Sequence, residues 1–303
     1  MFDEIVVPVD GSPFGELALP IALGIACKSG GEVRIVTVIT PLPVDDTQKD
    51  SGASEEGRLL LAREHAEGYQ EELQKRVILS GCDVPISCHV ETGSVVERLD
   101  EHTRRVGADL LVMTTHGRGP LRRAWLGSVA DGLVRRTPCP VLAIRPQKGE
   151  GIRLEERELH HILVTLDGSP ESQEILPFAQ GLAHLFGARL TLLRVIPPHY
   201  PLTSPFTTHS GHGFQGLEEE AETARATLEA KAAPLREDGL TVEIDAVMGA
   251  HPAEGILEYA DAAKVDLVAM TTHGRGGVSR LILGSVADKV IRGGSLPVLL
   301  HRA

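Results

Sequence analysis

Apolar residues follow two alternating patterns along the chain, short continuous runs and longer stretches with helical spacing. Runs such as Ile5 to Asp10 and Asp109 to Met113 are rich in branched apolar residues and end at turn residues, which is typical of buried strands. Stretches such as Arg58 to Leu79 carry their charged residues on one helical face. Because strands alternate with helices, we expect parallel strands joined by helical crossovers, which is an α/β fold.

The pattern predicts the same order of elements in each half of the chain. The predicted strands are 5–10, 33–39, 85–90, 109–113 and 141–144, and then 161–167, 190–196, 242–247, 266–270 and 296–301. The predicted helices include 16–27, 58–79, 94–105 and 128–136, and in the second half 218–235 and a helix that opens at 249–252. The stretches 41–57 and 197–216 are rich in Pro, Ser and Gly and are predicted loops.

A glycine-containing segment occurs twice at a fixed interval. Met113 to Gly119 reads Met-Thr-Thr-His-Gly-Arg-Gly and recurs unchanged at 270–276, and a Leu-Gly-Ser-Val-Ala-Asp segment follows both copies, at 126–131 and 283–288. The differences 273 − 116 and 284 − 127 both equal 157. This repeat predicts two domains, 1–147 and 158–303, with the charged, aperiodic stretch between them as a linker. Each domain is expected to be a doubly wound, Rossmann-like sheet with helices on both faces.

Composition limits the classes of binding partner and the cellular compartment that we expect for this protein. A formal net charge of −12 over 303 residues argues against nucleic acid or an anionic membrane as the main partner, because both favour a basic surface. The first four residues include two acidic ones where a signal peptide would be basic, and no apolar run approaches the length of a membrane span, so we expect a cytoplasmic protein. The four cysteines form no C-x-x-C pair, which predicts reduced thiols and no zinc site.

The repeated segment has the chemistry of an anion site. A strand, a glycine loop and a helix start present backbone N–H groups and the positive end of the helix dipole to a ligand. In an open parallel sheet, ligands lie beyond the carboxyl ends of the strands, where the strand order reverses. Asp10 ends the first strand and is therefore expected to accept hydrogen bonds from ribose hydroxyls, while Gly117, Gly127 and Ser128 hold phosphates. The alternative is that Asp10 and Ser12 only cap the next helix and the glycines only turn the chain.

These residues together resemble the universal stress protein (UspA-like) family. Its nucleotide-binding members carry G-x-x-G, nine residues, and then G-[S/T]. Here the nine residues 118–126 separate Gly117 from Gly127, and 275–283 separate Gly274 from Gly284, each followed by serine. The resemblance extends to Val-Pro-Val-Asp-Gly-Ser at the start and Thr-Pro-Cys-Pro-Val-Leu at the end of the first half. It implies a tandem member with two adenine nucleotide alpha hydrolase-like domains, each a five-stranded parallel sheet.

The resemblance also implies a function and a set of binding residues. It implies a stress-response protein that binds adenine nucleotide, ATP with or without Mg²⁺, in each domain, with a regulatory rather than a metabolic output. Asp10 and Asp167 would lie near the adenine and ribose, and Val38 and Val195 would line the base pocket. The predicted binding residues are Val9, Asp10, Val38, Met113, Thr114, His116, Gly117, Arg118, Gly127, Ser128 and Val129 in the first domain, and Leu166, Asp167, Val195, Met270, Thr271, His273, Gly274, Arg275, Gly284, Ser285 and Val286 in the second.

One departure from the family pattern keeps two alternatives open. Thr114 and Thr271 stand where the family motif has its first glycine, and their hydroxyls could replace a lost contact or their bulk could weaken binding. The first alternative is a nucleotide-free scaffold or interaction protein. The second is a slow ATPase or autokinase, although the sequence contains no G-x-x-x-x-G-K-[S/T] loop, no G-x-S-x-G and no histidines at metal spacing. No catalytic residue and no metal ligand is predicted.

The fifth strand of each half is a candidate pairing surface. An exposed apolar edge strand invites pairing, and members of the resembled family commonly dimerise through this strand. We therefore expect 141–144 to pair with 298–301 within one chain, as an intramolecular pseudo-dimer. A homodimer of whole chains is a further possibility that the resemblance implies.

Overall fold

The structure is a computed structural model that describes residues 1–41, 55–81, 83–115, 127–146, 158–197, 212–272 and 283–303. Its internal contacts divide the chain into two compact units, Met1–Glu158 and Leu159–Ala303. We call them the first and second unit and describe each by itself. The domain limits 1–147 and 158–303 remain a prediction, because residues 147–157 lie outside the described part of the chain.

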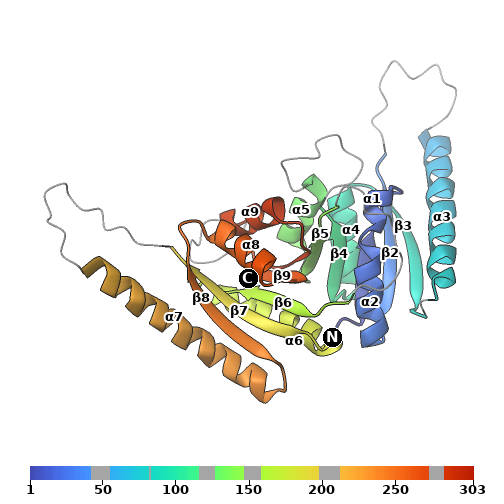
Figure 1. Ribbon diagram of the computed structural model, residues 1–303. Helices are drawn as coiled ribbons and strands as arrows, with labels where there is room; N and C mark the ends of the chain where they lie inside the picture. The colour runs from blue at the N-terminus through green and yellow to red at the C-terminus, as the bar shows by residue number, and fades with distance from the viewer. Residues whose placement is uncertain (42–54, 82, 116–126, 147–157, 198–211, 273–282) are drawn as a thin grey trace, which may run out of the picture. The chain divides into compact units, whose positions relative to one another are not determined.

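The first unit contains a five-stranded parallel sheet (Figure 1). Its strands lie in the order β3-β2-β1-β4-β5. The chain adds β2 and β3 on one side of β1 and then crosses over to add β4 and β5 on the other side, so the strand order reverses at β1. The strands are β1 Glu4–Pro8, β2 Glu32–Ile39, β3 Ile86–Thr92, β4 Leu110–Thr114 and β5 Val141–Ile144. The helices are α1 Pro13–Glu16, α2 Leu19–Ser29, α3 Glu55–Leu79, α4 Val95–Val106 and α5 Ser128–Arg136.

The second unit repeats this arrangement in the order β8-β7-β6-β9-β10. Its strands are β6 His161–Thr165, β7 Arg189–Ile196, β8 Val242–Met248, β9 Leu267–Thr271 and β10 Val298–His301. A 3₁₀ turn, η2 Glu171–Ile175, precedes the helices α6 Leu176–Phe186, α7 His212–Glu237, α8 Pro252–Ala262 and α9 Ser285–Gly293. The predicted fold class, two tandem α/β units of Rossmann-like type, is confirmed.

The central strands form the core because helices cover both of their faces. Every residue of β4 and of β9 is buried, as continuous apolar runs require in a parallel sheet. Polar contacts identify the two faces in the first unit. Gln70 of α3 donates to Oγ1 of Thr37 at 3.0 Å, whereas His102 of α4 contacts Glu91 at 3.1 Å. Thus α2 and α3 lie on one face and α4 and α5 on the other, as right-handed crossovers dictate.

Three predicted boundaries are wrong in detail. The first helix was expected to be continuous over 16–27, but α1 ends at Glu16 and α2 begins at Leu19. Pro20 explains the break, since it has no backbone N–H to donate to the carbonyl of Glu16 and so interrupts the helical hydrogen bonds there. The two predicted loops are shorter than expected, because α3 begins at Glu55 and α7 at His212. The added residues, 55–57 and 212–216, include three glycines, so helix propensity does not explain the extension.

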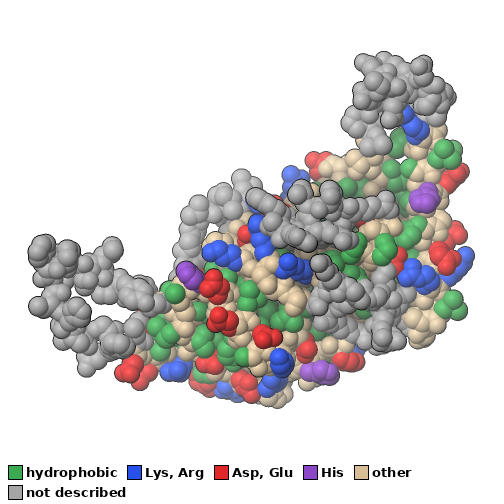
Figure 2. All heavy atoms as spheres, turned by 45° about the horizontal axis from the view of Figure 1, so that its top comes forward, with side chains coloured by type: hydrophobic (Ala, Val, Ile, Leu, Met, Phe, Trp, Pro, Cys, Tyr) green, Lys and Arg blue, Asp and Glu red, His purple; other side chains and the backbone are tan. Residues whose placement is uncertain are grey.

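Acidic and basic side chains are interspersed over the face of the molecule shown in Figure 2. Among the described residues, no helix combines the length and the apolarity that crossing a bilayer requires.

Candidate functional site

The turn after the first strand is built around an aspartate in each unit. Oδ1 of Asp10 accepts hydrogen bonds from the backbone N of Ser12 at 3.0 Å and from its Oγ at 2.5 Å. The Ser12 Oγ in turn accepts from the backbone N of Gly15 at 3.3 Å and so caps α1. Asp167 and Ser169 make the same contacts at 2.9 and 2.6 Å. The capping role that the sequence left as an alternative is therefore present.

The turn uses only one of the two carboxylate oxygens of Asp10. Both hydrogen bonds from Ser12 reach Oδ1, and among the described residues no hydrogen bond reaches Oδ2. Asp10 is exposed at the carboxyl end of the sheet, just beyond the buried residue Val9. The carboxylate can thus serve the turn and a ligand at the same time.

The end of β4 lies beside the start of α5. The backbone N of Thr115 donates to the carbonyl of Ile144 at 2.8 Å, and the backbone N of Gly127 donates to the carbonyl of Thr115 at 2.9 Å. Gly127 is the N-cap residue of α5 and Ser128, the first helical residue, is exposed. These bonds hold the N-terminus of a nine-residue helix at the carboxyl edge of the sheet.

The second unit has the same construction. The backbone N of Thr272 donates to the carbonyl of His301 at 2.9 Å, and the backbone N of Gly284 donates to the carbonyl of Thr272 at 2.7 Å. Gly284 is the N-cap residue of α9, and Ser285 is exposed. Because a glycine cap carries no side chain, no side-chain capping hydrogen bond reaches the first N–H groups of α5 and α9, and such groups can bind an anion.

The strand order brings the predicted residues to one edge. β1 lies between β2 and β4, so the residues that end these three strands are neighbours at the point where the strand order reverses. The predicted residues at this edge are Val9, Asp10, Val38, Met113, Thr114, Gly127, Ser128 and Val129 in the first unit, and Leu166, Asp167, Val195, Met270, Thr271, Gly284, Ser285 and Val286 in the second. The predicted residues His116, Gly117, Arg118, His273, Gly274 and Arg275 lie outside the described residues.

A buried ion pair supports the Asp10 turn from the helical side. Glu16 is 4% exposed and ends α1. Its Oε1 accepts from the Tyr69 hydroxyl at 3.0 Å, and its Oε2 accepts from Nη2 of Arg76 at 2.8 Å. Burial, the charge of Glu16 and its hydrogen bond raise the pKa of Tyr69, and the charge of Asp10 adds to the effect. The hydroxyl therefore remains a neutral donor, and α3 is tied to the turn that carries Asp10.

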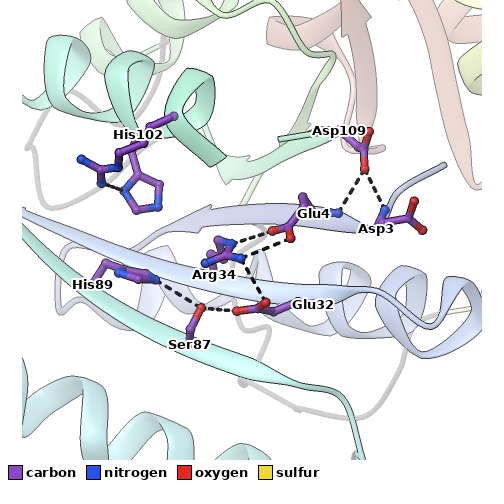
Figure 3. A network of polar contacts seen from close by, with 9 residues as sticks. Asp3, Glu4, Glu32, Arg34, Ser87, His89, His102 and Asp109 are labelled. Carbon is purple, nitrogen blue, oxygen red and sulfur yellow. Dashed lines mark hydrogen bonds and ion pairs between the residues drawn. The ribbon is translucent and has the colours of Figure 1, made fainter. Parts of the chain in front are cut away.

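Sequence reasoning missed a polar network on the α4 face of the first unit (Figure 3). Nδ1 of His102, a residue that is 1% exposed, lies 3.1 Å from Oε1 of Glu91 and 2.8 Å from Nη2 of Arg105. The rings of His89 and His102 are 4.9 Å apart. Burial raises the pKa of Glu91, but hydrogen bonds from Arg105 and His102 outweigh it and hold this pKa below its ordinary value. Glu91 is the register partner of Val38, so this network borders the candidate site.

The alternation of charged residues along β2 and β3 was the sequence signal that could have indicated this network. Glu32 and Arg34 on β2 and His89 and Glu91 on β3 are each two residues apart, a spacing that puts each pair on one face of the sheet. Arg34 Nε donates to Oε2 of Glu4 at 2.5 Å, and Nη2 of Arg34 donates to Glu32 at 3.1 Å (Figure 3). Spacing alone did not reveal that these side chains meet.

Acid is expected to destabilise the first unit through His89. Burial, and then the charges of His102, Arg34 and Arg105, lower the pKa of His89 from its ordinary value of 6.5. The unfolded chain therefore binds more protons below that value than the folded chain does, so stability present above pH 6.5 is lost as the pH falls. Urea midpoints at pH 7.5 and about 5.5 measure the loss, and His89→Gln is expected to reduce it.

A second histidine provides the comparison for this experiment. Burial and the charge of Arg189 lower the pKa of His161, which lies in the second unit. His161→Gln should therefore reduce the acid sensitivity of the second unit and leave that of the first unchanged. Equal acid sensitivity of the first unit in the wild type and in His89→Gln would contradict the assignment.

Comparison with known proteins identifies relatives along the whole chain. The sequence model of the universal stress protein family matches twice, over residues 1–145 and 158–302. Universal stress protein MT2052 of Mycobacterium tuberculosis is 30% identical to the chain, over 98% of this chain and 94% of that protein. Universal stress protein Slr1230 of Synechocystis sp. is 25% identical over 99% of each.

A solved structure shares the fold along the full length. The crystal structure of a universal stress protein from Archaeoglobus fulgidus matches with a TM-score of 0.70 and 19% identity, covering 100% of this chain and 99% of that chain. At this identity the likeness concerns the fold, which agrees with the two parallel sheets described above.

Proposed function

The chain belongs to the universal stress protein family, and from this premise we propose that each of its two units binds an adenine nucleotide at the carboxyl edge of its sheet. One observation carries the proposal. In both units a glycine-capped helix start is hydrogen-bonded to the residue that follows the fourth strand. The first strand, which ends in the aspartate turn, is the neighbour of the fourth strand, and the second strand lies next to the first. This juxtaposition pairs donors for phosphate with an acceptor for ribose hydroxyls.

The proposal assigns a role to each part of the edge. Asp10 and Asp167 accept hydrogen bonds from the ribose, and Val38 and Val195 line the base pocket with the neighbouring apolar residues. The helix starts at Gly127 and Gly284 hold the phosphates, together with the predicted loop residues that precede them. The site residues are those named above for each unit, and ATP is the proposed ligand.

The residues fit a nucleotide better than a protein-bound metal. The described residues include no group of three His, Cys, Asp or Glu side chains that could hold a metal ion. A Mg²⁺ ion would therefore arrive with the nucleotide, held chiefly by phosphate oxygens and water, as is common for this ion. When bound, it would neutralise phosphate charge that the helix N-termini also attract.

The two threonines in the glycine position do not oppose the proposal. Thr114 is 8% exposed and Thr271 is 7% exposed, so both side chains are almost fully covered at the ends of β4 and β9. A covered side chain takes little space from a ligand at the edge. This supports nucleotide binding over the scaffold alternative, in which threonine bulk abolishes the site.

The proposed output is regulatory rather than catalytic. Among the predicted site residues that the structure describes, Asp10 and Asp167 are the titratable groups, and both serve the turn. Each accepts two hydrogen bonds from a serine of its own turn, which gives these carboxylates a structural and ligand-accepting role in the proposal. The rival function, slow ATP hydrolysis or autophosphorylation, predicts turnover of labelled ATP, whereas the proposal predicts bound ATP without turnover.

Mass spectrometry of small molecules released from the purified, denatured protein tests the proposal. We expect adenine nucleotide in the released fraction, and calorimetry with added ATP and Mg²⁺ is expected to give two sites per chain after that nucleotide is removed. If no nucleotide is released and no heat is measured, the binding proposal fails and the scaffold function takes its place.

The proposal includes an intramolecular pseudo-dimer. β5 and β10 are each the last strand in the order of their own unit; β5 is apolar throughout, and β10 is apolar over its first three residues. Their pairing would satisfy the backbone N–H and C=O groups of two edge strands within one chain. Crosslinking mass spectrometry on the nucleotide-binding sample tests this, and crosslinks that place the two strands far apart would contradict it.

A further inference from the structure

The two proposed sites differ at one position beside the base-lining valine. α4 begins at Val95 and α8 at Pro252, and both helices then bury an aliphatic residue, Leu99 in the first unit and Ile256 in the second. The residue just before this buried position is Arg98 in the first unit and Gly255 in the second. The equivalent position thus carries a cation in one unit and no side chain in the other.

In the second unit the helix backbone lies close to Val195. A Cβ built on Gly255 would lie 3.1 Å from Cγ1 of Val195, and one built on Gly249 would lie 3.0 Å from the same atom. The methyl groups of Val195 therefore fill the space that two glycines leave. These contacts are therefore apolar, and Gly255 itself carries no side-chain donor.

In the first unit the side chain of Arg98 packs against the corresponding glycine, Gly93. Gly93 and Gly249 are equivalent, since their backbone N groups donate to Ile39 and Ile196 at 2.9 and 3.0 Å. A Cβ built on Gly93 would lie 3.1 Å from Nε and 3.3 Å from Cγ of Arg98. The arginine stem therefore packs against Gly93, whose backbone N donates to Ile39, the last residue of β2 and the chain neighbour of Val38.

The partner of Arg98 does not hold it strongly. Nη1 of Arg98 lies 2.8 Å from Oε2 of Glu101, one helical turn further along α4. These side chains are 39% and 56% exposed, and exposed pairs of this kind contribute little to stability. The guanidinium group can exchange this carboxylate for a ligand atom at small cost.

We propose that Arg98 sets the base selectivity of the first unit, so that this unit accepts guanine as well as adenine nucleotide while the second unit takes adenine only. The inference rests on the proposed function, because it requires the base to lie beside Val38. Arginine has five N–H donors and no acceptor. Guanine presents two neighbouring acceptors, O6 and N7, to such a donor pair, whereas adenine presents N7 beside an amino donor.

Equilibrium titration of the nucleotide-free full chain with ATP and with GTP tests the inference. We expect two ATP sites and one GTP site per chain. Arg98→Gly introduces the residue of the second unit and is expected to weaken GTP binding about tenfold, with both ATP sites retained. Arg98→Lys keeps the charge but loses the planar donor pair, so it should also weaken GTP binding.

Glu101→Gln is the matched control, because it removes the ion pair and leaves Arg98 in place. GTP binding is expected to persist in this variant. If ATP binds and GTP does not, or if Arg98→Gly binds GTP as the wild type does, the inference is wrong and the proposed function stands. Two GTP sites per chain would also refute the inference, since the second unit has no arginine here. If neither nucleotide binds, the proposed function itself fails.

Discussion

Arg76→Ala is expected to destabilise the first unit by about 2 kcal/mol. The substitution removes the cation that lies 2.8 Å from Oε2 of Glu16 and leaves a carboxylate whose side chain is 5% exposed. Loss of one partner of a fully buried ion pair costs roughly 3–5 kcal/mol. Arg76 is itself 37% exposed, so water can reach part of the vacated space and the expected cost is smaller. Urea unfolding of the full chain, followed by a probe in the first unit, measures the effect.

Two variants separate the buried pair from an ordinary surface pair. Arg63→Ala removes an i,i+4 partner of Glu67 from the same helix, but these side chains are 55% and 49% exposed, so the expected cost is about 0.5 kcal/mol or less. Glu16→Gln combined with Arg76→Met removes both charges and should recover most of the lost stability, since Gln173 stands at the equivalent position of the second unit. Equal losses of unfolding free energy for Arg76→Ala and Arg63→Ala would show that the Glu16–Arg76 pair contributes no more to stability than a surface pair does.

The hydrophobic pattern was sufficient to predict the sheets. β4 and β9 each have four consecutive apolar residues before a threonine, and a run that is buried on both faces is characteristic of a central parallel strand. The interval of 157 residues then showed that the second unit repeats the first. The break between α1 and α2 was not predicted, because Pro20 is compatible both with a new helix start and with a kink in a longer helix.

Contacts between distant residues were not accessible from the pattern. Glu16 and Arg76 are 60 residues apart, and each is unremarkable within its own helix. The meeting of His102 with Glu91 depends on how α4 packs on β3, which periodicity does not specify. The candidate site was more predictable, because its residues follow strand ends and parallel strands share one carboxyl edge. The difference between Arg98 and Gly255 is visible in the sequence, but its place beside the valine needed the structure.

Asp10→Ala is expected to remove nucleotide binding from the first unit and reduce the stoichiometry from two ATP per chain to one. A carboxylate that accepts ribose hydroxyls contributes about 1.5–3 kcal/mol, so the loss in affinity should be at least about tenfold. Asp167→Ala is expected to do the same for the second unit. Calorimetric titration of each variant with ATP measures both the stoichiometry and the affinity of the remaining site.

The turn must be separated from the ligand role, because Asp10 also accepts both hydrogen bonds from Ser12. Asp10→Asn keeps an acceptor oxygen for Ser12 and removes the charge, so stability should be preserved while ATP binding weakens. Ser12→Ala removes the cap of α1 and keeps the carboxylate, so stability should fall by about 1 kcal/mol while ATP binding persists. If Asp10→Asn binds as the wild type does and Ser12→Ala loses binding as fully as Asp10→Ala, Asp10 acts only through the turn. In that case the ribose contact belongs to another group at the edge of the sheet.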